Sequence, residues 1–507
     1  MFRDERRDKV WNEIRQHDLR AFTQLTPELF AEAARRANVR IGQSALNLVN
    51  LVWLGIAAAR QHSASFGIVL TSTLKLLEDQ EGFSRTPLGK AQRPSPADKK
   101  GKKRKARPKS KHDPRGQKPA EVTEEAFAQA RQKMPLPFWT ALLLLLAEQF
   151  QKEHRQHLDC HGFRLLAMDG STLVLPNDQR LRAHYGTPKN GCRKRAAPQA
   201  RMLMITLPGT RIPIAYEIAP LKDSELKMAG RMMGHIRPND LLLMDRGYFC
   251  YGLFWQIQNR GAYFGTRLKG RINYKKRKCL GRDDWLVDWT PKDSRGRWKE
   301  LPRSIQLRLI RYKIRGFRAS ALITNVLDPR RLSREDWLQM ASECDSKGQL
   351  APGLYHRRWQ IESTFFELKV TLRLKSLRSL TPKSLEYELA GRVVHYLLLR
   401  WLIVRAAEKH RLDPLQISFT NAVQELELAR SSLLTASLPW LGELLPRLLD
   451  RVASHLVPSR PGRHYPRPKD TKPKASGRKR KPRPNSKLSN RINTKHKKTK
   501  RSRTRQA

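Results

Sequence analysis

The feature that most constrains the fold is a change in the hydrophobic pattern at residue 163. "FRLLAMDGSTLVLP" predicts a strand, a turn at Asp169-Gly170 and further strand, and "ARMLMITLPGTRIPIAYEIAP" predicts a hairpin. "SELKMAGRMMGHI" is typical of a helix. "NDLLLMDRGYF" contains a short apolar run that indicates a strand buried on both faces. "YGLFWQIQNRG" then predicts a helix that ends at Gly261.

This order of elements predicts an α/β domain. Three strands in a meander, a helix, a buried strand and another helix are the layout of a ribonuclease-H-like core. The strands predicted at "AYFGTRL", "SIQLRLIRYKI" and "RASALITNV" look inserted before the last core helix, at about residues 262–325. We therefore expect a ribonuclease-H-like catalytic domain over residues 121–458, with this β insertion and with C-terminal helices.

The segments outside this domain differ from it in composition. Residues 1–92 look helical, with "LTPELFAEAARRANVR" as one helix, and form either a DNA-binding domain or an ordinary helical domain. Residues 93–120 and 459–507 are rich in Pro, Ser and basic residues and nearly free of large apolar ones. We expect the first to be a disordered basic linker and the second a disordered basic tail.

The charge of the chain indicates a polyanionic partner. The formal net charge of the 507 residues is +55. Residues 94–118 carry 11 Lys and Arg against 2 Asp, and residues 459–507 carry 20 against 1. Because these two segments account for only about half of the excess, the folded part is basic as well. Nucleic acid is the partner that such a field favours.

No segment of the sequence indicates a membrane or an oxidising compartment. "MFRDERRDKVWNEIRQ" lacks the apolar core of a signal peptide, and "LVNLVWLGIAAA" and "VVHYLLLRWLIV" are too short or too interrupted to span a bilayer. The five cysteines are scattered and include no CxxC pair, which argues against disulfides and structural zinc. We expect a cytoplasmic, nucleoid-associated protein.

Three acidic residues are candidates for a shared site. Asp169 and Asp245 follow the first and the buried core strand, and Glu362 lies in a helix predicted within "APGLYHRRWQIESTFFELKV". Strand ends and a facing helix can bring such distant carboxylates together. Each residue also has an ordinary explanation: a turn at Asp169, a cap or ion pair at Asp245, and a solvated helix face at Glu362.

The helix around Glu362 has an ordered polar edge. On an α-helical wheel, Arg358, Glu362 and Lys369 fall within roughly 60° of Tyr355. A separate apolar stripe consists of Leu354, Ile361, Phe365, Leu368 and Leu372. One edge is therefore expected to pack, while the other presents a carboxylate between cations and a phenol.

These residues resemble a known family. The spacing Y-x2-R-x3-E-x6-K of Tyr355, Arg358, Glu362 and Lys369, together with "RWQIE" and "DRGY", is similar to DDE transposases of bacterial insertion sequences, in the insertion sequence four family. The resemblance spans roughly residues 163–375. It implies metal-dependent DNA cleavage and strand transfer, with Asp169, Asp245 and Glu362 as catalytic ligands of Mg²⁺ or Mn²⁺. Tyr355, Arg358 and Lys369 would bind DNA.

The resemblance also implies partners and leaves alternatives. Double-stranded DNA, as terminal inverted repeats and as target, would be bound by a homodimer in cut-and-paste transposition. Some relatives excise through a DNA hairpin and stack a flipped base on a Trp where this chain has Ser320; Trp285, Trp289 or Trp298 are possible substitutes. A nuclease on the same core, or a catalytically inactive DNA-binding relative, are the competing interpretations.

Overall fold

The structure is a computed structural model that describes most of the chain. The described residues are 24–42, 46–60, 123–188, 196–270, 272–292, 299–313, 319–344, 350–435 and 438–458. The predicted linker at 93–120 and tail at 459–507 lie outside them. The chain divides into two units, Met1–Val457 and Pro458–Ala507, and the description below concerns the first.

The centre of this unit is a mixed β-sheet. Its core strands follow the order β4-β3-β2-β5-β6. The meander β2–β3–β4 is antiparallel, whereas β5 runs parallel to both β2 and β6. This is the strand order of a ribonuclease-H-like core, which confirms the predicted fold class. The strand bounds are β2 Phe163–Val174, β3 Gln199–Leu207, β4 Ile212–Pro220, β5 Asp240–Met244 and β6 Tyr263–Arg267.

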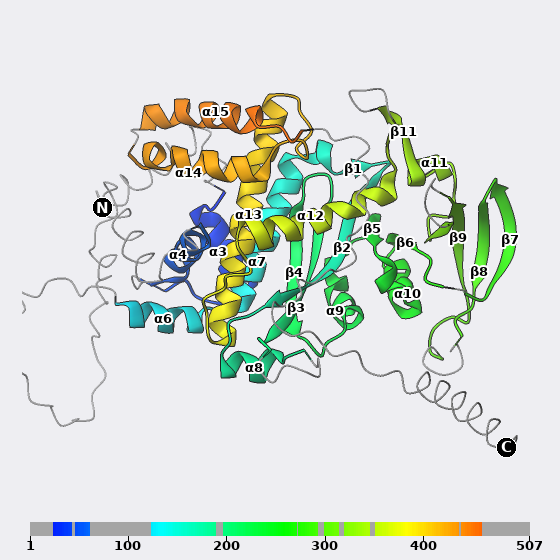
Figure 1. The fold of residues 1–507 in the computed structure, drawn as a ribbon, viewed down its shortest axis with the longest axis horizontal. Helices are drawn as coiled ribbons and strands as arrows, with labels where there is room; N and C mark the ends of the chain where they lie inside the picture. Colours follow the sequence, from blue (N-terminus) through cyan, green and yellow to red (C-terminus); the bar gives the residue numbers. More distant parts are fainter. Residues whose placement is uncertain are drawn as a thin grey trace, which may run out of the picture. The chain divides into compact units, whose positions relative to one another are not determined.

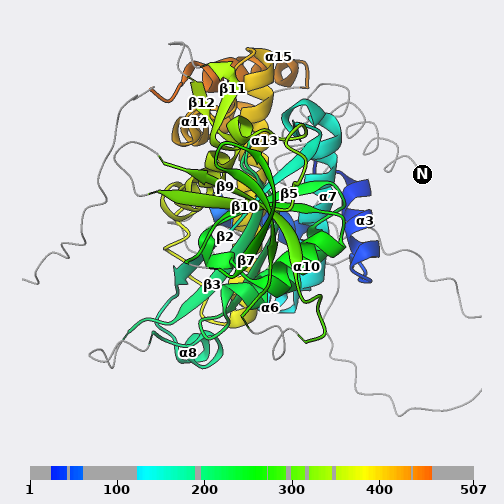
Figure 2. The same ribbon diagram turned by 90° about the vertical axis from the view of Figure 1, so that its right-hand side faces the viewer.

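The β-rich insertion extends the same sheet. β10 pairs antiparallel with β6, and the order continues β10-β9-β8-β7, so that the sheet has ten strands with β1 included. β6 is thus a core strand, and the added strands follow it. Figure 2 shows the twist that accumulates along the sheet. The remaining strands are β7 Tyr274–Gly281, β8 Asp284–Trp289, β9 Ile305–Tyr312, β10 Ser320–Thr324, β1 Asp159–Cys160, and a separate pair β11 Gln339–Cys344 and β12 Leu350–Pro352.

Short helices cover both faces of the core strands. On one face, Phe254 of α10 (Tyr251–Asn259) stacks on Phe264 with ring centroids 4.2 Å apart, and α9 (Glu225–Met232) packs on β3 and β4. On the other face, Leu241 and Leu243 pack with Trp337 of α11 (Arg334–Leu338) and with Leu354. β5 is buried on both faces because helices cover it from each side, as its continuous apolar run predicts.

A long buried helix joins the N-terminal and C-terminal parts of this unit. α13 (Pro382–Lys409) contacts α4 (Leu48–Arg60), α6 (Glu124–Lys133), α7 (Leu136–Glu153) and β4, and it also packs on α14 (Phe419–Thr435) and α15 (Leu438–Ser454) (Figure 1). α3 (Pro27–Arg36), capped by Thr26, packs on α7. The described N-terminal helices therefore share one core with the sheet. α8 (Gln179–Tyr185) completes the α-helices, of which none described is long and apolar enough to cross a membrane.

Two local predictions were wrong. Asp169-Gly170 is not a turn but lies inside β2, since β3 pairs with β2 as far as Val174. The segment predicted as one helix around Glu362 is a 3₁₀ turn η4 (Leu354–Trp359), the α-helix α12 (Gln360–Phe366) and a π turn η5 (Glu367–Thr371). An ideal α-helical wheel therefore does not describe its side-chain directions. Short 3₁₀ turns η1 (Arg155–His157), η2 (Met233–His235) and η3 (Arg246–Tyr248) link other elements.

Candidate active site

The strand register places two of the predicted carboxylates side by side. Met168 of β2 pairs with Met244 of β5, and Met244 pairs with Thr266 of β6. The next residues along these three parallel strands are Asp169, Asp245 and Arg267. They therefore occupy neighbouring, in-register positions on adjacent strands, at the point where the parallel pairing ends. Arg267 faces Asp245, with its Nη2 3.6 Å from the carboxylate Oδ1.

A buried arginine connects the third carboxylate to the first. Arg358 donates from Nη2 to Glu362 Oε1 at 3.0 Å and from Nη1 to Asp169 Oδ2 at 3.5 Å. Its side chain is only 3% exposed, whereas that of Glu362 is 39% exposed. The guanidinium thus lies between a strand carboxylate and a helix carboxylate, and holds α12 against β2.

Burial changes the acidity of Asp169. The pKa of this carboxyl is raised to about 6, mainly by desolvation and to a smaller extent by the negative charges of Glu362 and Asp245. The Gly170 N–H, which donates to Oδ1 at 2.8 Å, and the Arg358 guanidinium both act in the opposite direction. A second positive charge at this position would favour the ionised carboxylate.

The two remaining signature residues contact the ends of the same strands. The Tyr355 hydroxyl donates to the Met244 carbonyl at 3.2 Å, one residue before Asp245. Lys369 Nζ donates to the Ser171 hydroxyl and, at 2.9 Å, to the Thr172 carbonyl. Partial burial lowers the pKa of Lys369. The structure therefore brings Tyr355, Arg358, Glu362 and Lys369 together along the strands that carry Asp169 and Asp245.

The donor chemistry of this group suits a hard divalent cation. Asp169, Asp245 and Glu362 offer only carboxylate oxygens, which Mg²⁺ prefers, and a cation would offset the buried charge of Asp169. Within the described part of the chain, no three His, Cys, Asp or Glu side chains are arranged as a group that could hold a metal ion. Arg358 is the cation that the structure places between two of the carboxylates.

Sequence reasoning missed residues that support this group. Arg267 could have been found from the parallel pairing of β5 and β6, which puts it level with Asp245. Glu225 has no such signal. It accepts from the Tyr248 hydroxyl at 3.2 Å, and its carboxyl carbon would lie 2.7 Å from a Cβ at Gly170. Gly170 therefore provides space for this side chain and does not make a turn.

The tryptophans considered for base stacking differ in their surroundings. Trp289 is 6% exposed and packs against Phe249 and Tyr251, which identifies it as a core residue. Trp285 is half-buried, with Lys276 Nζ 4.2 Å from its ring centroid. Trp298 lies outside the described residues.

Comparison with known proteins identifies the family of this domain. Residues 161–398 match the family model of the transposase DDE domain. The chain is 26% identical over 354 residues to transposase InsG for insertion sequence element IS4 of Escherichia coli, covering 68% of this chain and 76% of that protein. It is 27% identical over 142 residues to the putative transposase InsZ of the same organism, covering 28% and 48% of the two chains.

A solved structure shows a more distant resemblance. The piggyBac transposase synaptic complex with hairpin DNA is 12% identical, with a TM-score of 0.35 over 87% of this chain and 85% of that one. At this TM-score the resemblance supports no argument about the site. The domain match and the two Escherichia coli relatives agree with the ribonuclease-H-like fold and the signature spacing. Residues 161–398 are therefore a transposase DDE domain, and the chain is similar to transposases of the insertion-sequence-four type.

Proposed function

We propose that this protein is a transposase that binds the double-stranded terminal inverted repeats of an insertion sequence, cleaves them and joins them to target DNA by cut-and-paste transposition. The observation that carries this proposal is that Asp169 and Asp245 are in-register neighbours at the end of the parallel strands β2 and β5. Glu362 is linked to Asp169 through Arg358. Two adjacent carboxylates and a third on a facing helix suit phosphodiester chemistry.

We infer that Asp169, Asp245 and Glu362 hold Mg²⁺, or Mn²⁺ in its place. When bound, such ions supply the Lewis acidity that activates the attacking oxygen and stabilises the leaving one. Asp169 contributes a carboxylate whose burial makes a positive neighbour favourable. Asp245 is half-exposed beside Arg267, and Glu362 is exposed enough to reach a ligand in solvent.

The cationic residues would bind and orient the DNA backbone. Arg358 carries its positive charge between Asp169 and Glu362, and a guanidinium can donate to phosphate as well as to carboxylate. Lys369 places a positive charge at Ser171, which lies two residues after Asp169 in β2. The Tyr355 hydroxyl binds the carbonyl of Met244, the residue before Asp245. Because two ends must be cut in one complex, we infer that the protein acts as a homodimer on DNA.

The test uses purified protein and labelled duplexes that carry the inverted repeats flanking the coding sequence. With Mg²⁺ we expect strand cleavage at the repeat boundary and products joined to a supercoiled target, and neither product with a chelator. Cleavage without joined products would favour the nuclease interpretation. Sequence-specific binding without cleavage in either Mg²⁺ or Mn²⁺ would contradict the proposed activity.

A further inference from the structure

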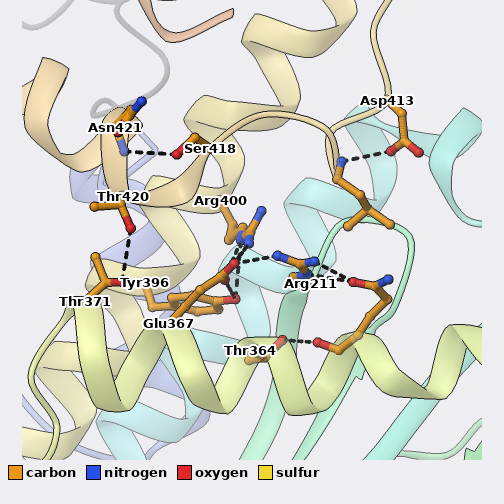
Figure 3. Close-up of polar contacts among 12 residues, drawn as sticks. Arg211, Thr364, Glu367, Thr371, Tyr396, Arg400, Asp413, Ser418, Thr420 and Asn421 are labelled. Carbon is orange, nitrogen blue, oxygen red and sulfur yellow. Dashed lines mark hydrogen bonds and ion pairs between the residues drawn. The ribbon is translucent and has the colours of Figure 1, made fainter. Parts of the chain in front are cut away.

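A second charged group lies where the helix of the candidate site packs on α13. Glu367 is 6% exposed, and both its carboxylate oxygens accept hydrogen bonds. Arg211 Nη1 lies 2.5 Å from Oε1, where Arg400 Nη2 also donates. The Tyr396 hydroxyl donates to Oε2 at 2.7 Å and Arg400 Nε at 3.1 Å (Figure 3). We call Glu367, Arg211, Arg400, Tyr396 and Gln360 the Glu367 cluster.

The Glu367 cluster ties two separate elements to the site helix. Tyr396 and Arg400 are one turn apart on α13, and Arg211 lies in the turn between β3 and β4 with φ of +59°. Arg211 also donates from Nε and Nη2 to Gln360 Oε1, at 2.8 and 2.6 Å. Gln360 is two residues before Glu362, and Glu367 is two residues before Lys369. The cluster thus holds the helix on both sides of Glu362.

The cluster coincides with an irregular helical turn. At Glu367 the α-helix becomes a π turn, closed by a bond of 2.9 Å from Leu372 N to the Glu367 carbonyl, five residues back. Such a turn accommodates one more residue than an α-helical turn, so it changes the directions of the side chains around it. Here Glu367 points towards α13, while Lys369 reaches Ser171 and Thr172 of β2.

The physical cost of the cluster indicates a purpose other than stability. Burying a carboxylate with two guanidiniums requires desolvation of all three, and apolar residues of similar volume are often equally stabilising. Arg400 is fully buried and its Nη1 has no partner. The arrangement does, however, define a single position for the helix that carries Glu362 and Lys369.

We propose that the Glu367 cluster is a positioning device for the active site: it fixes the π turn and thereby directs Lys369 towards β2 and holds Glu362 opposite Asp169. This inference rests on the proposed roles of Glu362 and Lys369. The members of the cluster act through these two residues and do not contact DNA or metal themselves.

The test separates the rate of cleavage from the affinity for DNA. Glu367→Gln keeps the shape of the side chain and removes its charge, and Arg400→Met keeps length without the guanidinium. Each is expected to slow single-turnover cleavage of bound ends at least tenfold, while the affinity for ends changes less than threefold. If Arg400→Met does not fold, it is replaced by Tyr396→Phe, which removes only the hydroxyl and its bonds to Glu367 and Arg400 and is expected to slow cleavage less. The matched control is Arg308→Met, since Arg308 is an equally buried guanidinium paired with Asp284 in the inserted strands; it should leave the rate within twofold.

A double-mutant cycle tests the route of the effect. Because part of the proposed effect runs through Lys369, Glu367→Gln should slow cleavage by a clearly smaller factor in the Lys369→Ala background than in the wild-type protein. Fully multiplying effects, or cluster variants that behave like Arg308→Met, would overturn the inference. A Glu362→Gln arm tests the proposed function separately. Cleavage by that variant at the wild-type rate would contradict the proposed role of Glu362. The cycle of Glu367→Gln and Lys369→Ala would still show whether the cluster acts through Lys369.

Discussion

Arg358 is the residue on which the geometry of the site depends most directly. It is nearly buried and neutralises two carboxylates that come from residues 189 and 4 positions away in the sequence. Loss of such a partner leaves Asp169 as an unpaired buried charge, which is more costly than loss of an exposed ion pair. The same guanidinium is also a candidate donor to the phosphate of bound DNA.

At the residue scale we therefore predict unequal effects on cleavage and binding. Arg358→Ala and Lys369→Ala should each slow single-turnover cleavage of bound ends about 100-fold, since loss of one preorganised donor can cost about 3 kcal/mol in the barrier. Their effect on overall affinity should be small, because the net charge is +55. Tyr355→Phe should be milder, as it removes only the hydroxyl bond to Met244.

Lys152→Ala is the control for these variants, since Lys152 is an exposed cation on α7. It should not change the rate of cleavage of bound ends. If Arg358→Ala and Lys369→Ala matched this control, the polar edge formed by Tyr355, Arg358, Glu362 and Lys369 would have no role in cleavage.

At the element scale, α4 and α13 approach each other closely at a pair of glycines. A Cβ at Gly391 would lie 2.7 Å from the backbone oxygen of Gly55. Gly391→Ala should therefore lower the free energy of unfolding by about 1–3 kcal/mol, as expected for overpacking. Gly230→Ala in α9 is the matched control, since the nearest atom to a Cβ there is 3.9 Å away. It should be neutral or stabilising by up to about 1 kcal/mol. Equal effects of the two changes in denaturant unfolding would contradict the packing of α4 on α13.

The same helix makes stability dependent on pH. Burial lowers the pKa of His395 to about 3, and the charges of Arg60 and Arg392 contribute to the shift. The unfolded chain takes up this proton below about pH 6.5, whereas the native protein does not until about pH 3. Between these values the unfolded state binds more protons, so stability should fall as pH falls, by up to about 1.4 kcal/mol per pH unit. His395→Leu should remove this part of the slope; an unchanged profile would show that His395 is not responsible.

The sequence predicted the elements better than the details of the site. The apolar run of β5 and the signature spacing were sufficient for the fold class and for bringing Asp245 and Glu362 into one hypothesis. Gly170 was misread as a turn because an Asp-Gly pair is the same in sequence whether it turns the chain or provides space for Glu225. The Glu367 cluster could not be predicted, because its partners lie 156 and 33 residues from Glu367 and meet it only through the π turn.

At the scale of the whole molecule, the charge distribution predicts how DNA affinity responds to salt. Residues 459–507 carry 20 Lys and Arg against 1 Asp and follow the compact unit that ends at Val457. Removing them should weaken DNA binding and make the log–log dependence on salt shallower, since fewer phosphate contacts release counterions. Thermal unfolding of the compact unit should be unchanged. An unchanged salt slope would mean that the tail does not contact DNA.

The central claim is that three carboxylates from two strands and a helix form one catalytic group. Its most direct test is single-turnover cleavage of labelled ends by Asp169→Ala, Asp245→Ala and Glu362→Ala, with end binding measured on the same preparations. We predict that each variant binds ends with nearly wild-type affinity, because carboxylates repel rather than attract phosphate, and that none cleaves them. Cleavage by any one variant at close to the wild-type rate would contradict the assignment of that residue and the account of the site.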